Sequence, residues 1–389
     1  MTSPVGDWPL PSVVPLGTLG PLGTPLSKGD GQSKSVSPLT QHQGWLAKLY
    51  NGPLDTAATT RLDTLVALPG AASDTDCALL RSSTSWPVAR ITDQGATVGC
   101  VIPTAPPNFR VTIQASATSS LDKHLEIDWL AMPDATLVGR GVRAPSPQER
   151  LKVCRSVVAV AACLERHRIV YSDWSYSNAF WDPLTHAAYV IDVDGCGQGT
   201  MPNIFQPNWE DPLTPRGTAA DGGADRFRVA LLTARCLTGV REAWDAVHVL
   251  PTACDRAGAP GLSDVLLDML LAADRRHRPT LDTLHSVMLG RPYFRLKVDR
   301  VSVASPAAAP PQADAAPAHQ NAAAGPPVTV PPTSGVPAAQ PTGTAHSPSA
   351  PAGGQQPTTG GPGGSPAGTA TVVALLLLVL FVVVFITLT

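Results

Sequence analysis

The sequence predicts an α+β protein made of two differently composed lobes and a tail. Residues 23–103 contain short apolar or alternating segments bounded by glycine and proline, a pattern typical of strands. Residues 104–300 contain longer stretches with apolar residues three and four apart, which is typical of helices. From 301 to 371 there is no aromatic residue and a single acid, so little apolar surface could be buried. We therefore expect a flexible leader (1–22), a smaller β-rich lobe (23–103), a larger helical lobe (104–300), a disordered linker (301–369) and a transmembrane helix (370–389).

Three strands and one helix are predicted with defined bounds in the smaller lobe. Trp45–Tyr50 alternates its faces as a strand does, and residues 86–91 and 97–102 predict two further strands joined by a tight turn. Residues 55–68 carry apolar side chains at helical spacing, and we expect Pro69 to end that helix because proline has no backbone N–H.

The larger lobe begins its main helix at a recognisable cap. Ser146–Glu149 has the capping-box pattern with proline at the first helical position, and the apolar spacing that follows predicts a helix to His167. Further helices are expected over 224–232 and 280–289. The segment 104–125 is polar and irregular, and it predicts no element.

Three polar residues in the larger lobe mark a candidate site. Asp173 and Asn178 are five residues apart in a polar loop, and Asp192 follows a β-branched run that would deliver it to the end of a strand. One carboxylate could receive or orient a hydroxyl proton, while the amide and the second carboxylate could hold a divalent metal on a nucleotide's phosphates. From these residues alone an ordinary polar loop before a strand stays an open alternative.

Two features of the smaller lobe would suit a bound phosphate. The Gly29-x-Gly31 turn lets backbone N–H groups approach a triphosphate closely, although a plain hairpin turn could have the same sequence. Lys48 lies among apolar neighbours in its predicted strand, where burying an ammonium group is costly unless it meets an anion. A lysine at a strand edge, facing water, is the alternative.

In their order along the chain, these features resemble the protein-kinase superfamily, and most closely its divergent bacterial, eukaryotic-like branch. The resemblance extends over about residues 22–292 and rests on motifs that stand in the family's order. These are Gly29-x-Gly31 for the Gly-rich loop, Lys48 for the lysine of Val-Ala-Ile-Lys, Tyr171-Ser172-Asp173 for His-Arg-Asp, Asn178 for the catalytic-loop Asn, and Asp192-Val193-Asp194 for Asp-Phe-Gly.

The resemblance implies a bilobal protein-kinase-like fold that binds ATP and Mg²⁺. Lys48 would orient the phosphates and Asp173 the acceptor hydroxyl, while Asn178 and Asp192 would hold the metal.

The same resemblance implies further nucleotide contacts in the smaller lobe. Gly29 and Gly31 would cover the phosphates, and a hinge from Val101 to Thr104 would make backbone hydrogen bonds to adenine.

The resemblance also implies supporting contacts around the site. Asp63, on the predicted helix, would pair with Lys48, although the family usually has the longer glutamate there. Glu210 would form a buried ion pair with Arg278. Asp225 would brace the backbone of the Asp173 loop; capping its own helix is the alternative, and the two roles are compatible.

Several positions depart from the family's pattern. Lys34 replaces the third loop glycine, Tyr171 replaces the histidine, and Asp194 replaces the last glycine of Asp-Phe-Gly and could add a metal ligand. Ser172 replaces the arginine that would accompany an activation-loop phosphate. Control by phosphorylation of that loop, at Thr200, is therefore not expected.

The C-terminal sequence predicts the cellular location of the protein. Residues 370–388 are apolar except for two threonines and would span about 28 Å as a helix, close to the thickness of a bilayer's hydrocarbon core. A buried core helix is the alternative. Because no signal peptide is evident, we expect a cell-membrane protein with a C-terminal anchor and a cytoplasmic kinase-like domain. The seven cysteines show no paired spacing, which favours reduced thiols.

These patterns lead to an expected function. A net charge of −2 gives no field that would recruit nucleic acid. We expect a membrane-tethered, ATP-dependent Ser/Thr protein kinase whose partners are ATP, a protein substrate and the lipid bilayer. Two alternatives stay open: a pseudokinase scaffold that recruits partners to the membrane, and a small-molecule phosphotransferase on the same fold.

Overall fold

The computed structural model describes residues 7–28, 33–116, 118–294 and 299–301. Gly29 and Gly31, the greater part of the predicted linker and the predicted transmembrane helix (370–389) lie outside the described residues. Within those ranges, no helix is both long enough and apolar enough to cross a bilayer. All seven cysteines are free, as their spacing predicts.

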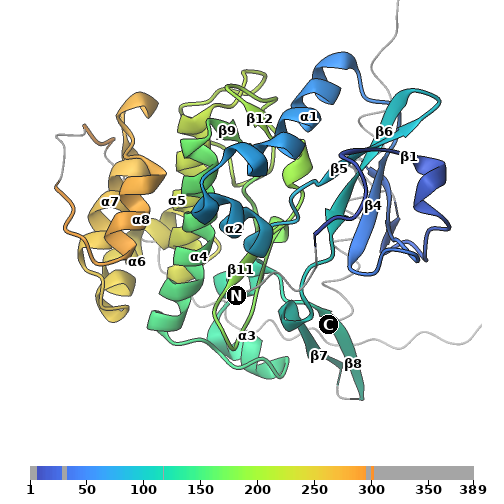
Figure 1. Cartoon of the computed structure of the whole chain (residues 1–389). Coiled ribbons are helices and arrows are strands. Elements are labelled where there is room, and N and C mark those ends of the chain that lie inside the picture. The colour runs from blue at the N-terminus through green and yellow to red at the C-terminus, as the bar shows by residue number, and fades with distance from the viewer. Residues whose placement is uncertain (1–6, 29–32, 117, 295–298, 302–389) are drawn as a thin grey trace, which may run out of the picture. The chain divides into compact units, whose positions relative to one another are not determined.

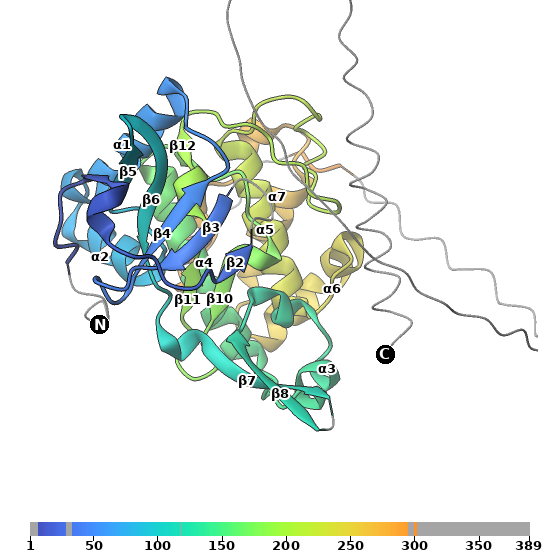
Figure 2. The same cartoon turned by 90° about the vertical axis from the view of Figure 1, so that its right-hand side faces the viewer.

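A six-stranded sheet forms the smaller lobe, seen on the right in Figure 1. Its strands lie in the order β1-β5-β6-β4-β3-β2, and all neighbours are antiparallel except the pair β1 and β5. Figure 2 shows β3, β4 and β6 side by side at the centre of the sheet. The bounds are β1 Val13–Pro15, β2 Ser27–Lys28, β3 Ser33–Pro38, β4 Trp45–Tyr50, β5 Ala89–Asp93 and β6 Ala96–Pro103.

Strand β1 of this sheet comes from the N-terminal segment, which corrects the prediction of a flexible leader (1–22) for its described residues, 7–22. Strand β1 pairs in parallel with β5. Val14 and Leu19 are buried with Ile91 in one apolar cluster on one face of the sheet. Burying these side chains offsets the entropy of ordering a segment rich in proline and glycine.

Helix α1, Thr56–Ala71, packs on the opposite face of the sheet, where Leu62 joins an apolar cluster with Leu46 and Cys100. Asp55 caps the helix and accepts a hydrogen bond from the Ala58 N–H at 2.7 Å.

Pro69 does not end α1, contrary to the prediction. In an unbroken helix the carbonyl of Leu65 would accept the N–H of residue 69, which proline lacks. Here Trp86 Nε1 donates to that carbonyl at 2.8 Å, so the oxygen keeps a partner and the helix continues to Ala71. Trp86 was predicted as the first residue of a strand, but β5 begins at Ala89.

The larger lobe is mainly helical and lies on the left in Figure 1. Helices α4 and α5 each contribute more buried side chains to its apolar core than any other helix does. The segment 104–125, for which the sequence predicted no element, contains the β7–β8 hairpin. The bounds are α2 Asp74–Ser83, α3 Asp134–Gly139, α4 Pro147–Arg166, α5 Gly222–Thr238, α6 Ala243–Arg256, α7 Gly261–Leu271, α8 Leu281–Met288, β7 Arg110–Ser116, β8 Ser119–His124, β9 Ile169–Val170, β10 Ala179–Trp181, β11 Ala188–Val190 and β12 Gly197–Gln198. The predicted α+β class is therefore confirmed.

The predicted capping box at the start of α4 is present. Glu149 N–H donates to Ser146 Oγ at 3.3 Å, and Ser146 N–H donates back to Glu149 Oε2 at 2.8 Å. Arg143 adds two hydrogen bonds to the same carboxylate, both at 2.9 Å. The hydrogen bonds from Arg143 and from the Ser146 backbone lower the pKa of Glu149 to about 2.

Replacing Glu149 with Gln should therefore destabilise the protein in a pH-dependent way. Because the pKa of Glu149 is lower in the folded protein than in the unfolded chain, its stabilising effect is complete above about pH 5 and is lost as the pH falls toward 2. Denaturant unfolding should show a gap of about 1 kcal/mol between wild type and Glu149→Gln at pH 7. The gap should shrink as the pH is lowered toward 3, and an equal gap at pH 3 and pH 7 would contradict this prediction.

Candidate active site

The loop that carries Asp173 is braced from α5. Asp225 is buried and accepts the backbone N–H groups of Tyr171 at 2.7 Å and Ser172 at 2.9 Å. Burial raises the pKa of Asp225 to about 6, although these two hydrogen bonds act in the opposite direction. The cap of α5 is Asp221 instead, which accepts from Gly223 N–H. The predicted brace is therefore confirmed, and the helix-cap alternative for Asp225 is wrong.

Two residues at the predicted carboxylates, Asp192 itself and the residue before Asp173, have left-handed backbone conformations. Ser172 has φ of 62° and Asp192 has φ of 58°. For residues with a β-carbon this conformation costs about 1–2 kcal/mol. Arg228, buried on α5, hydrogen-bonds to the Ser172 carbonyl and to Ile204 O at 2.8 Å, so it ties the strained loop to the segment after Asp192. Strain held in this way is common where a side chain must point into a functional site.

Asp173 and Asn178 lie together, and both are close to Asp192. Asn178 Nδ2 donates to the Asp173 carbonyl at 2.8 Å, and Ile191 N–H donates to the Asn178 carbonyl at 2.9 Å. The Asp173 carboxylate accepts a hydrogen bond from Gln206 Nε2, a residue that the sequence analysis did not identify. Burial raises the pKa of Asp173, the Asn178 hydrogen bond opposes this, and the charge of Asp192 raises it further.

Lys48 meets Asp192 from the other lobe, 144 residues away in sequence. The Lys48 Nζ lies 3.0 Å from Asp192 Oδ1 and 2.7 Å from Asp194 Oδ1. Lys48 is 7% exposed, so burial alone would lower its pKa. The carboxylates of Asp194 and Asp192 outweigh that effect and raise the pKa above its ordinary value. The strand lysine therefore points into an anionic site and not into water.

Asp63 does not pair with Lys48, which corrects the prediction. Its carboxylate accepts a hydrogen bond from Arg90 Nε on β5 at 2.7 Å. On α1 it is Leu62 that packs on the sheet, and the next residue is turned by about 100° around the helix axis, toward β5. The short aspartate side chain cannot reach back to Lys48 from there.

Val101 and Thr104, the two ends of the predicted hinge, both have backbone groups that are hydrogen-bonded within the smaller lobe. Val101 lies inside β6, paired with both neighbouring strands, and its carbonyl accepts from Val88 N–H at 2.9 Å. The Thr104 N–H donates to Gly44 O at 2.8 Å. Because these two backbone groups are hydrogen-bonded within the smaller lobe, the chain segment that connects the lobes begins only after Thr104.

The predicted buried ion pair is displaced by one residue. Arg278 makes two hydrogen bonds, at 2.6 and 2.7 Å, to the carboxylate of Asp211 and not to Glu210. Both partner side chains are 1% exposed. Trp209 is buried against Tyr176, so the chain turns Glu210 outward to Arg216 at 3.6 Å and brings the next side chain inward.

A second cluster, on α2 and α4, has metal-ligating atoms close together. Atoms of Asp76, Cys163 and His167 lie within 4.8 Å of one another. Both oxygens of the Asp76 carboxylate, however, already contact Arg166 at 2.5 Å and His167 at 3.0 Å. An arginine on the carboxylate indicates an ion pair that joins two helices and not a metal site.

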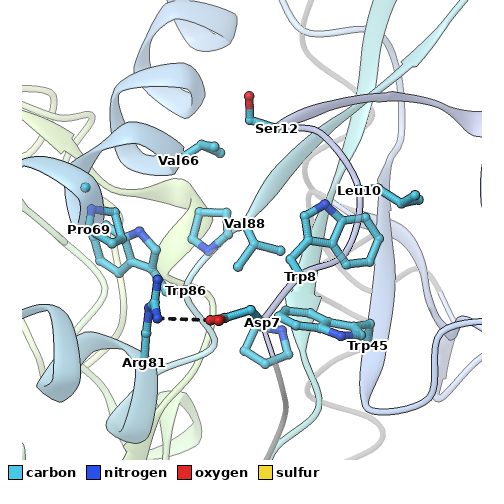
Figure 3. Close-up of a pocket in the computed structure, with 13 residues that line it drawn as sticks. Asp7, Trp8, Leu10, Ser12, Trp45, Val66, Pro69, Arg81, Trp86 and Val88 are labelled. Carbon is cyan, nitrogen blue, oxygen red and sulfur yellow. Dashed lines mark hydrogen bonds and ion pairs between the residues drawn. The ribbon is translucent and has the colours of Figure 1, made fainter. Parts of the chain in front are cut away.

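A cavity of about 400 Å³ lies in the smaller lobe, apart from this site (Figure 3). Three tryptophans, Trp8, Trp45 and Trp86, line it together with the C-terminal end of α1. Asp7 accepts a hydrogen bond from Arg81 at 3.1 Å within it. None of the predicted site residues lines this cavity.

Comparisons with known proteins find likeness in structure but not in sequence. No protein-family model matches the chain, and no curated protein sequence matches it. Among solved structures, the chain is similar to the ROP18 kinase domain in complex with AMP-PNP and sucrose. The two share 15% sequence identity with a TM-score of 0.44, over 69% of this chain and 80% of that one.

Proposed function

We propose that this protein is an ATP-dependent phosphotransferase of the protein-kinase type that acts on a serine or threonine hydroxyl of a protein. The observation that carries the proposal is the contact at 3.0 Å between Lys48 Nζ and Asp192 Oδ1. A buried amine from one lobe and a half-exposed carboxylate from the other, side chains 9% and 49% exposed, lie beside the Asp173 loop. This combination suits a nucleotide whose phosphates need a cation and whose metal needs a carboxylate.

The residues present fit a magnesium ion. Asp192 offers carboxylate oxygens that are half exposed. Asn178 uses its amide nitrogen on the Asp173 carbonyl, and its amide oxygen has only a long contact of 3.5 Å from the Ser177 hydroxyl, which a cation could replace. Carboxylate and amide oxygens are suitable ligands for Mg²⁺. A magnesium ion held there would neutralise charge on the nucleotide's phosphates.

Asp173 would orient the acceptor hydroxyl and take its proton. The burial that raises the pKa of Asp173 brings it nearer to the range in which a carboxylate can accept a proton. Its hydrogen bond from Gln206, a residue of the segment between Asp192 and α5, would hold the carboxylate in one orientation.

The hydrophobic C-terminal sequence belongs to the same proposal. An apolar stretch over 370–388 would anchor the protein in the cell membrane and leave the kinase-like domain in the cytoplasm. The linker between them would let that domain reach protein substrates near the bilayer.

One observation favours a second candidate, a pseudokinase that binds partners without transferring phosphate. Lys48 is held by two carboxylates, and a nucleotide would have to compete with them for the ammonium group.

The test measures binding and transfer on the full-length chain. We expect ATP with Mg²⁺ to raise the melting temperature, and γ-phosphate to appear on a generic protein substrate. Asp192→Asn should lose the Mg²⁺-dependent part of the shift, whereas Asp245→Asn, an exposed acid in the first turn of α6, should behave as wild type.

The outcomes separate the candidates. A thermal shift without transfer, unchanged by Asp173→Asn, would favour the pseudokinase. Transfer to a small-molecule alcohol but never to protein would favour the small-molecule phosphotransferase. The absence of any shift with ATP or ADP would refute nucleotide binding.

A further inference from the structure

The carboxylate of Asp194 has both of its oxygens engaged by β4. Oδ1 lies 2.7 Å from Lys48 Nζ, and Oδ2 accepts a hydrogen bond from the Tyr50 hydroxyl at 3.1 Å. Its side chain is 4% exposed, against 49% for Asp192. Of the two carboxylates on Lys48, Asp194 is thus the closer and the more buried.

The backbone on both sides holds this arrangement in place. Lys48 and Tyr50 are two residues apart on β4, so their side chains leave the same face of the sheet. Asp194 lies in a 3-10 turn over Val193–Gly195, and the buried Val193 accepts Cys196 N–H at 3.1 Å. The pairing of Asp194 with Lys48 therefore joins strand β4 to this 3-10 turn.

We propose that Asp194, supported by Tyr50, is the residue that positions Lys48 for the nucleotide phosphates, in place of an acid on α1. The inference rests on the proposed function, because it assigns the lysine's partner in that site. The α1 acid is occupied elsewhere, since Asp63 pairs with Arg90.

The charge balance explains why a second carboxylate is needed. Once Asp192 turns to a metal, a buried ammonium with no other partner would be strongly destabilised. Asp194 has no such competing duty, because its second oxygen is already used by Tyr50. Lys48 would thus keep Asp194 as its anion, and its remaining N–H groups would be available to the phosphates.

This arrangement has a consequence for control of the site. Asp194, the partner of Lys48, and Asp192, the proposed metal ligand, are two residues apart in one short segment, so a shift of that segment would displace both. Helix α1 contributes apolar packing through Leu62 but no charge to Lys48. Assembly of the phosphate site therefore does not depend on an ion pair from α1.

The test compares Asp194→Asn, Tyr50→Phe and the control Asp63→Asn in the full-length chain. Each is measured for ATP affinity, for KM and kcat of phosphate transfer, and for the Mg²⁺ concentration that gives half-maximal rate. Asp194→Asn should raise KM for ATP and lower kcat/KM by about 10- to 100-fold, as expected for loss of a charged hydrogen bond. For Tyr50→Phe, KM for ATP and kcat/KM should change in the same direction but by less. For Asp63→Asn, both should remain within about twofold of wild type.

The Mg²⁺ requirement distinguishes positioning from metal binding. We expect it to be unchanged in Asp194→Asn, and a several-fold increase would overturn the proposal in favour of Asp194 as a metal ligand. Wild-type ATP affinity in Asp194→Asn, or an equal loss in Asp63→Asn, would also overturn it.

A stability measurement tests the pairing of Asp194 with Lys48 independently of the proposed function. The unfolding free energies of Lys48→Met, Asp194→Asn and the double variant give the coupling between the two side chains without any nucleotide. If wild type binds no ATP but the coupling is large, the proposed function fails and the pairing of Asp194 with Lys48 stands. A coupling near zero would refute the pairing whatever the activity, and Tyr50→Phe serves the kinetic test if Asp194→Asn does not fold.

Discussion

Replacing Asp173 with Asn is expected to lower phosphate transfer by at least about 100-fold while leaving ATP binding nearly intact. The amide has the shape of the carboxylate but cannot take the acceptor's proton. Lys48 and Asp192, which make the proposed contacts to nucleotide and metal, are untouched by the change. The rate of γ-phosphate transfer and the thermal shift with ATP and Mg²⁺ together check this expectation.

The matched control is Asp93→Asn, the same chemical change at the exposed last residue of β5. It should leave both transfer and binding at wild-type levels. Equal transfer by wild type and Asp173→Asn would show that this carboxylate is not the proton acceptor. A parallel loss of ATP binding would show that the substitution disturbs the site more widely.

Replacing Asp211 with Asn is expected to lower the unfolding free energy by about 3–5 kcal/mol. The pair with Arg278 is 1% exposed on both sides, and its two hydrogen bonds are at 2.6 and 2.7 Å. Removing one charge leaves a buried guanidinium without an anion, and that is the main source of the loss. Arg278 also donates a hydrogen bond to Gly223 O, at 2.8 Å, in the first turn of α5. The N-terminal end of that helix should therefore be destabilised as well. Denaturant unfolding measures the change.

Glu210→Gln provides an adjacent control with the same chemical change. Glu210 is exposed and lies 3.6 Å from an exposed arginine, so its loss should alter the unfolding free energy by no more than about 0.5 kcal/mol. If Glu210→Gln were the more damaging of the two, the ion pair assigned to Asp211 would be wrong.

Patterns among neighbouring residues were sufficient to predict much of the fold. The strand Trp45–Tyr50 has the bounds that its alternation predicts, and the capping box at Ser146 starts α4 as expected. Such features depend on periodicity and on hydrogen bonds within one turn, which the local sequence contains. The resemblance to the protein-kinase superfamily also implied that Lys48 and Asp192 would lie in one site, and their side chains are in contact.

Which side chain pairs with which could not be read from the sequence. Lys48 is held by Asp194 and not by Asp63, and the partner of Arg278 is Asp211, one residue beyond the predicted glutamate. A step of one residue reverses a side chain on an extended segment or turns it by about 100° on a helix. Small errors in register therefore change the partner completely.

Contacts between distant segments decided the rest. Part of the proline-rich N-terminal segment forms strand β1 because it pairs with β5 and buries apolar side chains against the sheet. Helix α1 passes Pro69 because the indole of Trp86 supplies the missing hydrogen bond. The sequence by itself determined the local elements and the order of the site residues, and the tertiary structure alone decided their partners. The physical reason is that a buried charge or carbonyl is satisfied by whichever group the folded chain brings within about 3 Å of it.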